Sequence, residues 1–268
     1  IQRFGSMDYR GSFIMDADQI ETSGYALTSL GDADLDVLLS DYRNELKYSG
    51  NLLTDNLNLK QITEVEELGF VKGRIEFDGQ GTEINRLKVT ANGNLVYFDL
   101  MENRYHNVLL NGKIENQKFN GFLSIKDEKM NLDYTGTFDF SSQPYHFDFA
   151  STINHLDLDY LGVTEDLKAS LSAKMDGKFS FSNLDDFLGT LEMSDVQFNS
   201  KNKNLQISHA HLISSNKNGT QNLKLDVPDY LKGEVVGRFK LSQLPDALMN
   251  TVGSTALITY TPKEVDSG

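Results

Sequence analysis

The amino-acid sequence predicts an all-β protein: one elongated, repetitive, meandering sheet with few short helices. The first observation is a glycine frame. Of the 21 glycines, eleven have an apolar residue two positions before them and another two positions after them. At an apolar content of 39 %, only about three glycines would have such neighbours by chance. The second is that apolar residues alternate with polar ones over most of the chain, which places them on one face of a strand. The third is that helical spacing is confined to short segments.

The glycines of this frame lie on the apolar face of the predicted strands. A glycine there carries a backbone-entropy cost and leaves a notch among the side chains, so it is typical of places where a sheet bends or where something approaches the backbone closely. We therefore predict that seven of them shape a groove: Gly73, Gly93, Gly121, Gly136, Gly177, Gly189 and Gly237.

The predicted strands follow one another in chain order. The alternation covers fourteen runs: Tyr9–Met15, Ala33–Leu39, Leu46–Leu52, Val71–Phe77, Leu87–Leu100, Val108–Ile114, Phe119–Ile125, Met130–Phe140, Tyr145–Ile153, Ala169–Phe181, Gly189–Phe198, Leu205–Leu212, Leu223–Val227 and Leu231–Leu241. Turn residues favour turns at Asn92-Gly93, Lys126–Glu128, Ser141–Pro144 and Lys217–Gly219. Helix is expected only at Thr63–Leu68 and Leu244–Met249.

A longer period lies over the strands. The segment Asn56–Ile62 returns as His155–Leu161, each with the pattern Leu-x-Leu-x-x-Ile/Leu and each before a short acidic stretch. Such repetition predicts stacked modules that bury apolar surface against their neighbours. Residues 64–162 would be one complete module, residues 1–63 and 163–268 partial ones, all in one continuous elongated domain.

Composition restricts the partners. The net charge of −14 argues against nucleic acid and against attraction to anionic membrane surfaces, so we expect any lipid contact to be through the tails. The absence of cysteine excludes disulfides, thiolate metal sites and cysteine nucleophiles. No leader or membrane-spanning segment is recognisable, and we expect the chain to be a piece of a longer protein.

Two blocks carry a family resemblance. The run YHNVLLNGKIENQKFNGFLSIKDEKMNLDYTGTFDFSSQPYHFDFASTINHLDLDYLGV, Tyr105 to Val163, resembles the repeated core of TamB-type translocation and assembly proteins of the Bacteroidota. The run NLKLDVPDYLKGEVVGRFKLSQLPDAL, Asn222 to Leu248, resembles a segment further along the same proteins. The resemblance implies a member of the AsmA-like superfamily in the periplasm, anchored in the inner membrane outside this chain.

The resemblance also implies a shape and a cargo. Such proteins curl a long sheet into a β-taco-like trough with an apolar lining. They are thought to carry phospholipid acyl chains toward the outer membrane, or to assist assembly there with an Omp85-type, TamA-like barrel that another part of the chain would meet. Sixteen residues are expected to line the trough: Phe13, Met15, Ile75, Phe77, Leu95, Tyr97, Leu123, Ile125, Phe138, Phe140, Phe179, Phe181, Leu191, Met193, Phe239 and Leu241.

The polar motifs are weak. Asp32, Asp34 and Asp36 resemble the start of a calcium-binding loop, but the loop lacks its glycine and its final glutamate. We therefore favour the interpretation that they lie on the solvent-exposed face of a strand. His209 and His211 share a strand face without an identifiable third zinc ligand. Adjacent carboxylates such as Asp185-Asp186 point apart, unlike a glycosidase pair. We therefore expect no metal, no cofactor and no enzymatic activity.

An alternative of another class stays open. In it, the chain is a structural or cell-surface β-repeat module that binds a protein or a glycan, and its apolar face is only the core of a closed sandwich or barrel. The glycine frame favours the open trough modestly, because a closed core tends to fill notches with side chains.

Overall fold

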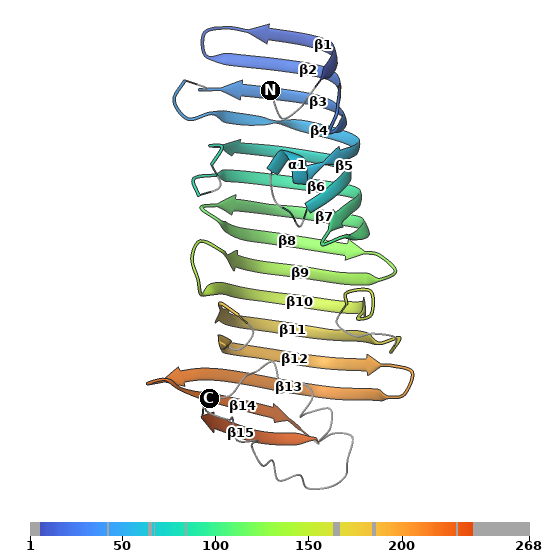
Figure 1. Cartoon of the computed structure of the whole chain (residues 1–268), viewed down its shortest axis with the longest axis vertical. Helices are drawn as coiled ribbons and strands as arrows, with labels where there is room; N and C mark the ends of the chain where they lie inside the picture. The colour runs from blue at the N-terminus through green and yellow to red at the C-terminus, as the bar shows by residue number, and fades with distance from the viewer. Residues whose placement is uncertain are drawn as a thin grey trace, which may run out of the picture.

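A computed structural model describes residues 6–237 apart from 42, 64, 65, 67, 84, 163–166, 184, 185 and 229. These residues form one antiparallel sheet of fifteen strands, and its spatial order is the order of the chain. Figure 1 shows the strands stacked along the long axis of the molecule, with β1 at one end and β15 at the other. The sheet is open, because β1 and β15 do not pair, and it is not strongly curled. The all-β meander predicted from the sequence is confirmed.

The bounds of the strands are β1 Met7–Met15, β2 Gln19–Thr28, β3 Gly31–Ser40, β4 Lys47–Asn58, β5 Leu68–Gln80, β6 Lys88–Leu100, β7 Asn103–Glu115, β8 Lys118–Lys126, β9 Met130–Asp139, β10 Tyr145–Asp157, β11 Ser170–Phe181, β12 Leu188–Asn199, β13 Asn204–Lys217, β14 Thr220–Val227 and β15 Leu231–Gly237. Each of the fourteen predicted runs falls on a strand, the last one only as far as Gly237. The alternation did not predict β2, because Thr22, Gly24 and Thr28 interrupt the apolar residues on the face of β2 that carries Ile20 and Ala26.

The short helix α1, Leu59–Thr63, lies earlier than predicted. It begins where the Asn58 side chain accepts a hydrogen bond from the backbone N–H of Gln61 at 3.2 Å, which satisfies one free donor of the first turn. The prediction of a helix over Thr63–Leu68 is wrong at its end, since Leu68 already belongs to β5. The second expected helix, Leu244–Met249, lies outside the described residues.

Three hairpins close with two-residue loops in the left-handed region. The φ angles are 50° and 66° at Met101-Glu102, 50° and 63° at Asn116-Gln117, and 54° and 78° at Asn218-Gly219. This conformation matches the twist of the adjoining strands. The predicted turn at Asn92-Gly93 is wrong: both residues lie inside β6, where Asn92 pairs with Glu76 and Asn111.

Register shifts divide the sheet lengthwise into two halves. All the shifts lie near one long edge of the sheet, where the even-numbered strands end and the odd-numbered strands begin. They occur beside Thr54 and Leu57, beside Lys72 and Gly73, beside Ile153, and beside Ser172 and Lys174. An extra residue in one strand locally increases the twist and bends the strand. We call this part of the sheet the bend half and the rest the open half.

The hydrophobic core lies in the bend half. Its centre is formed by Val71, Leu95, Tyr105, Val108 and Ile125, and Val71 is completely inaccessible to solvent. Two segments cover this core: α1 through Leu59, and the turn after β10 through Tyr160 and Leu161.

The turn after β10 is tied to β7. The Tyr160 hydroxyl donates to the carbonyl of Arg104 at 3.0 Å and accepts from its N–H at 3.1 Å. The Tyr160 ring also meets the Tyr105 ring edge-on, with the centroids 6.1 Å apart. Each of the two Leu-x-Leu-x-x-Ile/Leu segments therefore begins in the last residues of a shifted strand, and both contribute residues that pack against the core.

Candidate functional site

The open half carries a continuous apolar face. Residues paired directly across antiparallel strands point to the same face, so the register defines rows that cross the sheet. One row, the outer rung, runs through all fifteen strands without a shift: Met15, Ile20, Leu39, Tyr48, Gly79, Val89, Ile114, Phe119, Phe138, Phe147, Phe179, Gly189, Ser214, Leu223 and Val235. At about 4.8 Å per strand, this row extends over roughly 65–70 Å.

A second unbroken row lies beside the outer rung on the same face. We call it the glycine rung, because six of the eleven framed glycines occupy it: Phe13, Thr22, Val37, Gly50, Phe77, Ala91, Gly112, Gly121, Gly136, Phe149, Gly177, Leu191, Leu212, Leu225 and Gly233. The sequence placed these glycines on one face, and the structure aligns them across the strands.

Aromatic rings are concentrated where the two rungs cross β8–β11. Phe138 lies among four rings, with centroid distances of 4.7 Å to Tyr134, 4.9 Å to Phe147, 5.9 Å to Phe140 and 6.2 Å to Phe119. Phe147 continues the cluster to Phe179 at 5.3 Å and to Phe181 at 5.1 Å. Such pairs add about 0.5–1.5 kcal/mol beyond area burial.

This aromatic cluster is half-buried, unlike the core of the bend half. Phe140 is 46 % exposed, and Phe138, Phe147, Phe179 and Phe181 all keep intermediate exposure. Within the described residues no second sheet covers them, because every strand belongs to the single sheet. The apolar face of the open half is therefore accessible to a ligand or a partner.

The glycine notches are filled by rings from neighbouring strands. A Cβ atom on Gly177 would lie 2.6 Å from the Phe149 ring and 2.9 Å from the Phe179 ring, and one on Gly121 would lie 2.9 Å from the Phe119 ring. The predicted notches thus let large rings approach the backbone closely and do not leave empty space beside it. Pairing of an aromatic residue with a cross-strand glycine stabilises a sheet in this way.

Not every glycine position is crowded. A Cβ on Gly136 would meet backbone, the Asp148 carbonyl oxygen at 2.4 Å and Phe149 Cα at 2.6 Å, whereas one on Gly93 would find its nearest neighbour at 3.5 Å. We expect Gly136→Ala to destabilise the sheet by about 1–3 kcal/mol through overpacking, and Gly93→Ala to be neutral or stabilising by up to about 1 kcal/mol. Thermal unfolding of the two variants beside the parent checks this, and equal stabilities would contradict it.

Three of the remaining framed glycines adopt backbone conformations that side chains rarely take. The φ angle is 148° at Gly73, 137° at Gly189 and 150° at Gly237. Gly73 lies at a register shift, next to Lys72, and Gly189 pairs with Phe179. Glycine is needed at these positions for its left-handed φ.

Thirteen of the sixteen expected lining residues share the apolar face. They are Phe13, Met15, Ile75, Phe77, Leu95, Leu123, Ile125, Phe138, Phe140, Phe179, Phe181, Leu191 and Met193. Leu95 and Ile125 belong to the buried core of the bend half, whereas Phe13 and Met15 are at least 60 % exposed at the first strand. Phe239 and Leu241 lie outside the described residues.

Tyr97 lies on the opposite face. Gly73 pairs with Leu95 but Lys72 pairs with Tyr97, so Val96 is the extra residue of a bulge, and the alternation reverses there. The Tyr97 hydroxyl donates to the Asp55 carbonyl at 3.0 Å, and the Arg104 guanidinium stacks 4.0 Å above its ring. The sequence prediction assumed unbroken alternation from Leu87 to Leu100.

The expected lining omitted several residues that the structure places at its centre. Tyr48, Phe119, Phe147 and Phe149 belong to the outer or the glycine rung. Phe147 and Phe149 were recognisable from the alternation in Tyr145–Ile153, which puts both on the apolar face of that strand.

The other face of the sheet is polar and carries the charges. Asp139 is the most perturbed carboxylate of this face: the Lys118 ammonium at 2.8 Å, with the Ser141 hydroxyl at 2.6 Å, lowers its pKa to about 2. A lowered pKa means that this stabilisation is complete above the ordinary aspartate pKa of about 3.9 and is lost as the pH falls through about 2.

We expect Asp139 to titrate near pH 2 in the folded chain, and Lys118→Met to raise its pKa toward the ordinary value. Carbon-detected NMR titration of the aspartate carboxyls measures both. Lys178→Met serves as the control, because Lys178 pairs with Asp148 at 2.9 Å instead. An Asp139 pKa that is unchanged in Lys118→Met would contradict the assigned cause.

The weak polar motifs are dispersed over this face. Asp32, Asp34 and Asp36 are paired with Leu27, Tyr25 and Ser23 of β2 and do not surround a common point. The His209 and His211 rings are 6.5 Å apart, and His211 Nε2 lies 3.7 Å from Glu192. In the part of the chain that the structure describes, three or more histidine or acidic side chains do not come together as a set of metal ligands.

The fold and the face define a class, a single-layer antiparallel meander with one apolar and one charged surface. No protein-family model, curated protein sequence or solved structure matches the chain. None of the helices formed by the described residues has the length and apolar character needed to cross a bilayer.

Proposed function

We propose that the chain is a non-catalytic segment of a TamB-type, AsmA-like protein that conducts phospholipid acyl chains between the inner and outer membranes. The observation that carries the proposal is the outer rung, a row that crosses fifteen strands without a register shift on a face that no other described strand covers. Transport needs apolar contact at every point of the route. The outer rung supplies it without a dedicated binding residue, because fourteen of its fifteen positions are apolar or glycine and only Ser214 is polar.

The energy scale supports a continuous face. Each methylene kept out of water contributes about 0.8 kcal/mol, so an acyl chain of about sixteen carbons represents roughly 10 kcal/mol or more. A gap of a few residues would leave part of the tail in water and create a barrier to movement. The half-buried rings of the open half, together with Met15, Leu39 and Ile114 of the outer rung, offer contact along the way.

In this proposal the apolar face forms the floor of a trough in the periplasm. The membrane anchor and the segment that meets an Omp85-type barrel belong to other parts of the full protein. The core of the bend half closes one long side of the trough, and the acyl chains bind to the apolar face of the open half. Assistance in outer-membrane assembly would use the same face for apolar segments of a client protein.

Mass spectrometry of lipid extracted from the folded, purified chain tests the proposal. We expect co-purifying phospholipid, and photocrosslinking from position 147 to its acyl chains. The matched control is position 122, which pairs with Asn111 and Thr135 on the polar face. A chain without lipid that forms a stable dimer would instead indicate that a second copy covers the face as a closed core.

A further inference from the structure

A hollow lies on the polar face of the bend half, where β12 ends and β13 begins. It is lined by Asp195, Gln197, Gln206, Ser208 and Tyr230. Gln197 and Gln206 are a direct pair and alternate with Val196 and Ile207 of the apolar face, so their side chains point to the polar face. The volume of the hollow is about 570 Å³, which falls within the range of roughly 300–1,000 Å³ found for small-molecule sites.

Two departures from regular strand pairing form the hollow. Asp195 has a left-handed φ of 53°, and it has no partner in the ladder with β13, although the residues on both sides of it do. β14 pairs with β13 over His211–Lys217, so the edge of β13 beside Gln206 lies beyond that ladder. Tyr230 follows β14 and borders this edge, because its hydroxyl donates a hydrogen bond to the Gln206 carbonyl oxygen at 2.9 Å. The aromatic ring therefore stands as one wall of the hollow.

The polar groups of the hollow have unused hydrogen-bonding capacity. Within the described part of the chain, the side-chain amides of Gln197 and Gln206 have no hydrogen-bond partner. Each amide offers two N–H donors and one carbonyl acceptor. Asp195 contacts the Lys174 ammonium through Oδ2 at 2.8 Å, and its side chain is 65 % exposed, so Oδ1 stays available as an acceptor. Donors and acceptors therefore converge on the same space.

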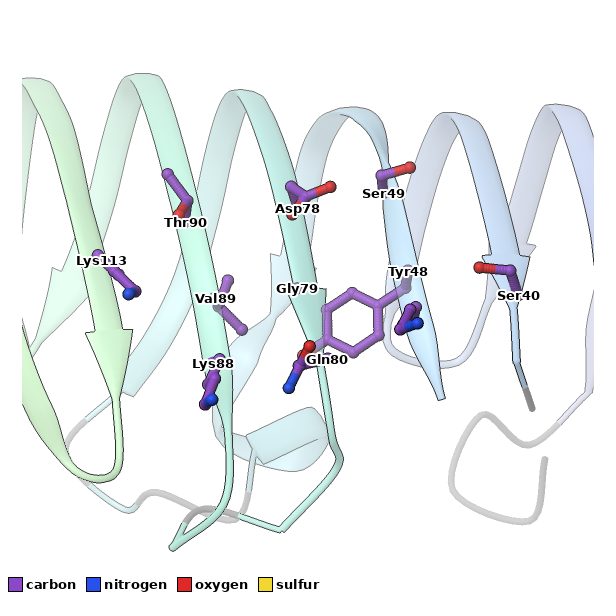
Figure 2. A pocket seen from close by; sticks show the side chains of 11 residues that line it. Ser40, Tyr48, Ser49, Asp78, Gly79, Gln80, Lys88, Val89, Thr90 and Lys113 are labelled. Atoms are coloured by element: carbon purple, nitrogen blue, oxygen red, sulfur yellow. The ribbon is translucent and has the colours of Figure 1, made fainter. Parts of the chain in front are cut away.

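A second hollow of the polar face lacks these features. Figure 2 shows this hollow, which lies across β4–β7 and has a volume of about 280 Å³. Two of its lysines, Lys88 and Lys113, are already in contact with the Glu115 carboxylate. Its aromatic residue, Tyr48, is a member of the outer rung on the apolar face. The hollow beside Tyr230 is therefore the better candidate for a ligand-binding site.

The groups around this hollow match a sugar ring better than an ion. The Asp195 carboxylate is balanced by Lys174, and the amide and hydroxyl side chains are neutral, so an ion would find no opposite net charge. The hydroxyls of a sugar both donate and accept hydrogen bonds, as amide and hydroxyl side chains do. A sugar ring also has a face of C–H groups that packs on an aromatic ring. Tyr230 is 50 % exposed and offers such a ring.

We propose that the hollow beside Tyr230 binds one sugar residue of an uncharged glycan. The Gln197 and Gln206 amides bind the ring hydroxyls, and Tyr230 packs against the C–H face of the same sugar. This inference goes beyond the proposed function and does not depend on it, because the hollow lies on the face opposite the outer rung. A glycan and an acyl chain can therefore be bound at the same time.

Two-dimensional NMR of the nitrogen-labelled chain tests the proposal, because each glutamine side chain gives its own pair of amide signals. The probes are tetrasaccharides of glucose, of galactose, of mannose and of N-acetylglucosamine, each at millimolar concentration. We expect at least one of them to shift the Gln197 and Gln206 signals. The signals of Gln80, which lines the hollow of Figure 2, should not move.

The double variant Gln197→Ala, Gln206→Ala should bind the same tetrasaccharide at least about fivefold more weakly, because it removes the hydrogen bonds of two amides. Tyr230→Ala should weaken binding as well, since it removes the ring. The matched control is Gln80→Ala, which should bind as the parent does. All these side chains are at the surface, so the unfolding temperatures of the variants should match that of the parent.

Each contrary result would overturn the proposal. One is that no tetrasaccharide shifts the two glutamine signals, and another is that the double variant binds as tightly as the parent. An equal shift with glycerol, at the same concentration of hydroxyl groups, would show that the amides respond to any polyol. Tighter binding of tetragalacturonate would assign a charged glycan, and a stronger shift with a digest of an unglycosylated protein would assign a peptide. None of these results would affect lipid binding by the apolar face, which is measured separately.

Discussion

Replacement of Phe138 and Phe179 by aspartate is expected to weaken acyl-chain binding more than tenfold while the sheet stays folded. Both residues belong to the outer rung and flank Phe147. Because their face is open, the new carboxylates can remain hydrated, and the main loss to the fold is the ring contacts, about 1–3 kcal/mol. A tail that loses contact equivalent to two methylenes is bound about 1.6 kcal/mol more weakly, which is more than tenfold.

Thermal unfolding and titration with a tail-labelled phospholipid measure the two effects separately. The control is the double variant Leu109→Asp, Phe122→Asp, whose positions lie on the polar face, 46 % and 36 % exposed. It introduces the same charge and should bind lipid as the parent does. A folded Phe138→Asp, Phe179→Asp variant with unchanged affinity would remove these phenylalanines from the lipid route, and an unfolded one would favour the closed-core alternative.

The largest effect on stability is expected for Val71→Asp. Val71 is completely buried among Leu95, Tyr105 and Val108, and no basic side chain belongs to that cluster. An unpaired carboxylate there costs several kcal/mol, which is comparable with the whole stability of a domain, so the bend half should unfold. Circular dichroism with hydrogen exchange of β5–β7 detects this loss.

Val96→Asp is the control for the buried charge. Val96 is the bulge residue of the neighbouring strand and is 52 % exposed, so its carboxylate would remain in water. We expect its melting temperature to lie within a few degrees of the parent. If Val71→Asp were as stable as Val96→Asp, the core of the bend half would not hold the sheet together.

The local alternation of apolar and polar residues was sufficient to predict most strands and to predict which residues of a strand share a face. Alternation places Phe138, Phe179 and Leu191 together without any knowledge of the register. It failed at β2, where Thr22 and Gly24 occupy the inner face, and at Tyr97, where one extra residue reverses the faces. The bulge at Val96 leaves no mark in the alternation, because its neighbours Leu95 and Tyr97 are apolar like Val96 itself.

The alignment of the glycines could not be predicted in the same way. Which glycine lies opposite which depends on the lengths of the hairpin loops, and the two-residue loops at Met101-Glu102 and Asn116-Gln117 contain no glycine that would identify them. For the same reason the sequence suggested empty notches, because the ring that fills each one comes from the adjacent strand. The Phe149 ring occupies the space beside Gly177 only because the register of β10 and β11 pairs these two residues directly.

The strict neighbour-to-neighbour order of the strands has a consequence for how the chain acquires its structure. Every strand pairs with the segments immediately before and after it in the chain, so no early segment has to wait for a late one. Chains with such local contacts fold quickly, and repeated arrays of this kind propagate from any folded nucleus. The protein can therefore take shape progressively during its synthesis, one hairpin after another. For the same reason its unfolding need not be a single all-or-none event.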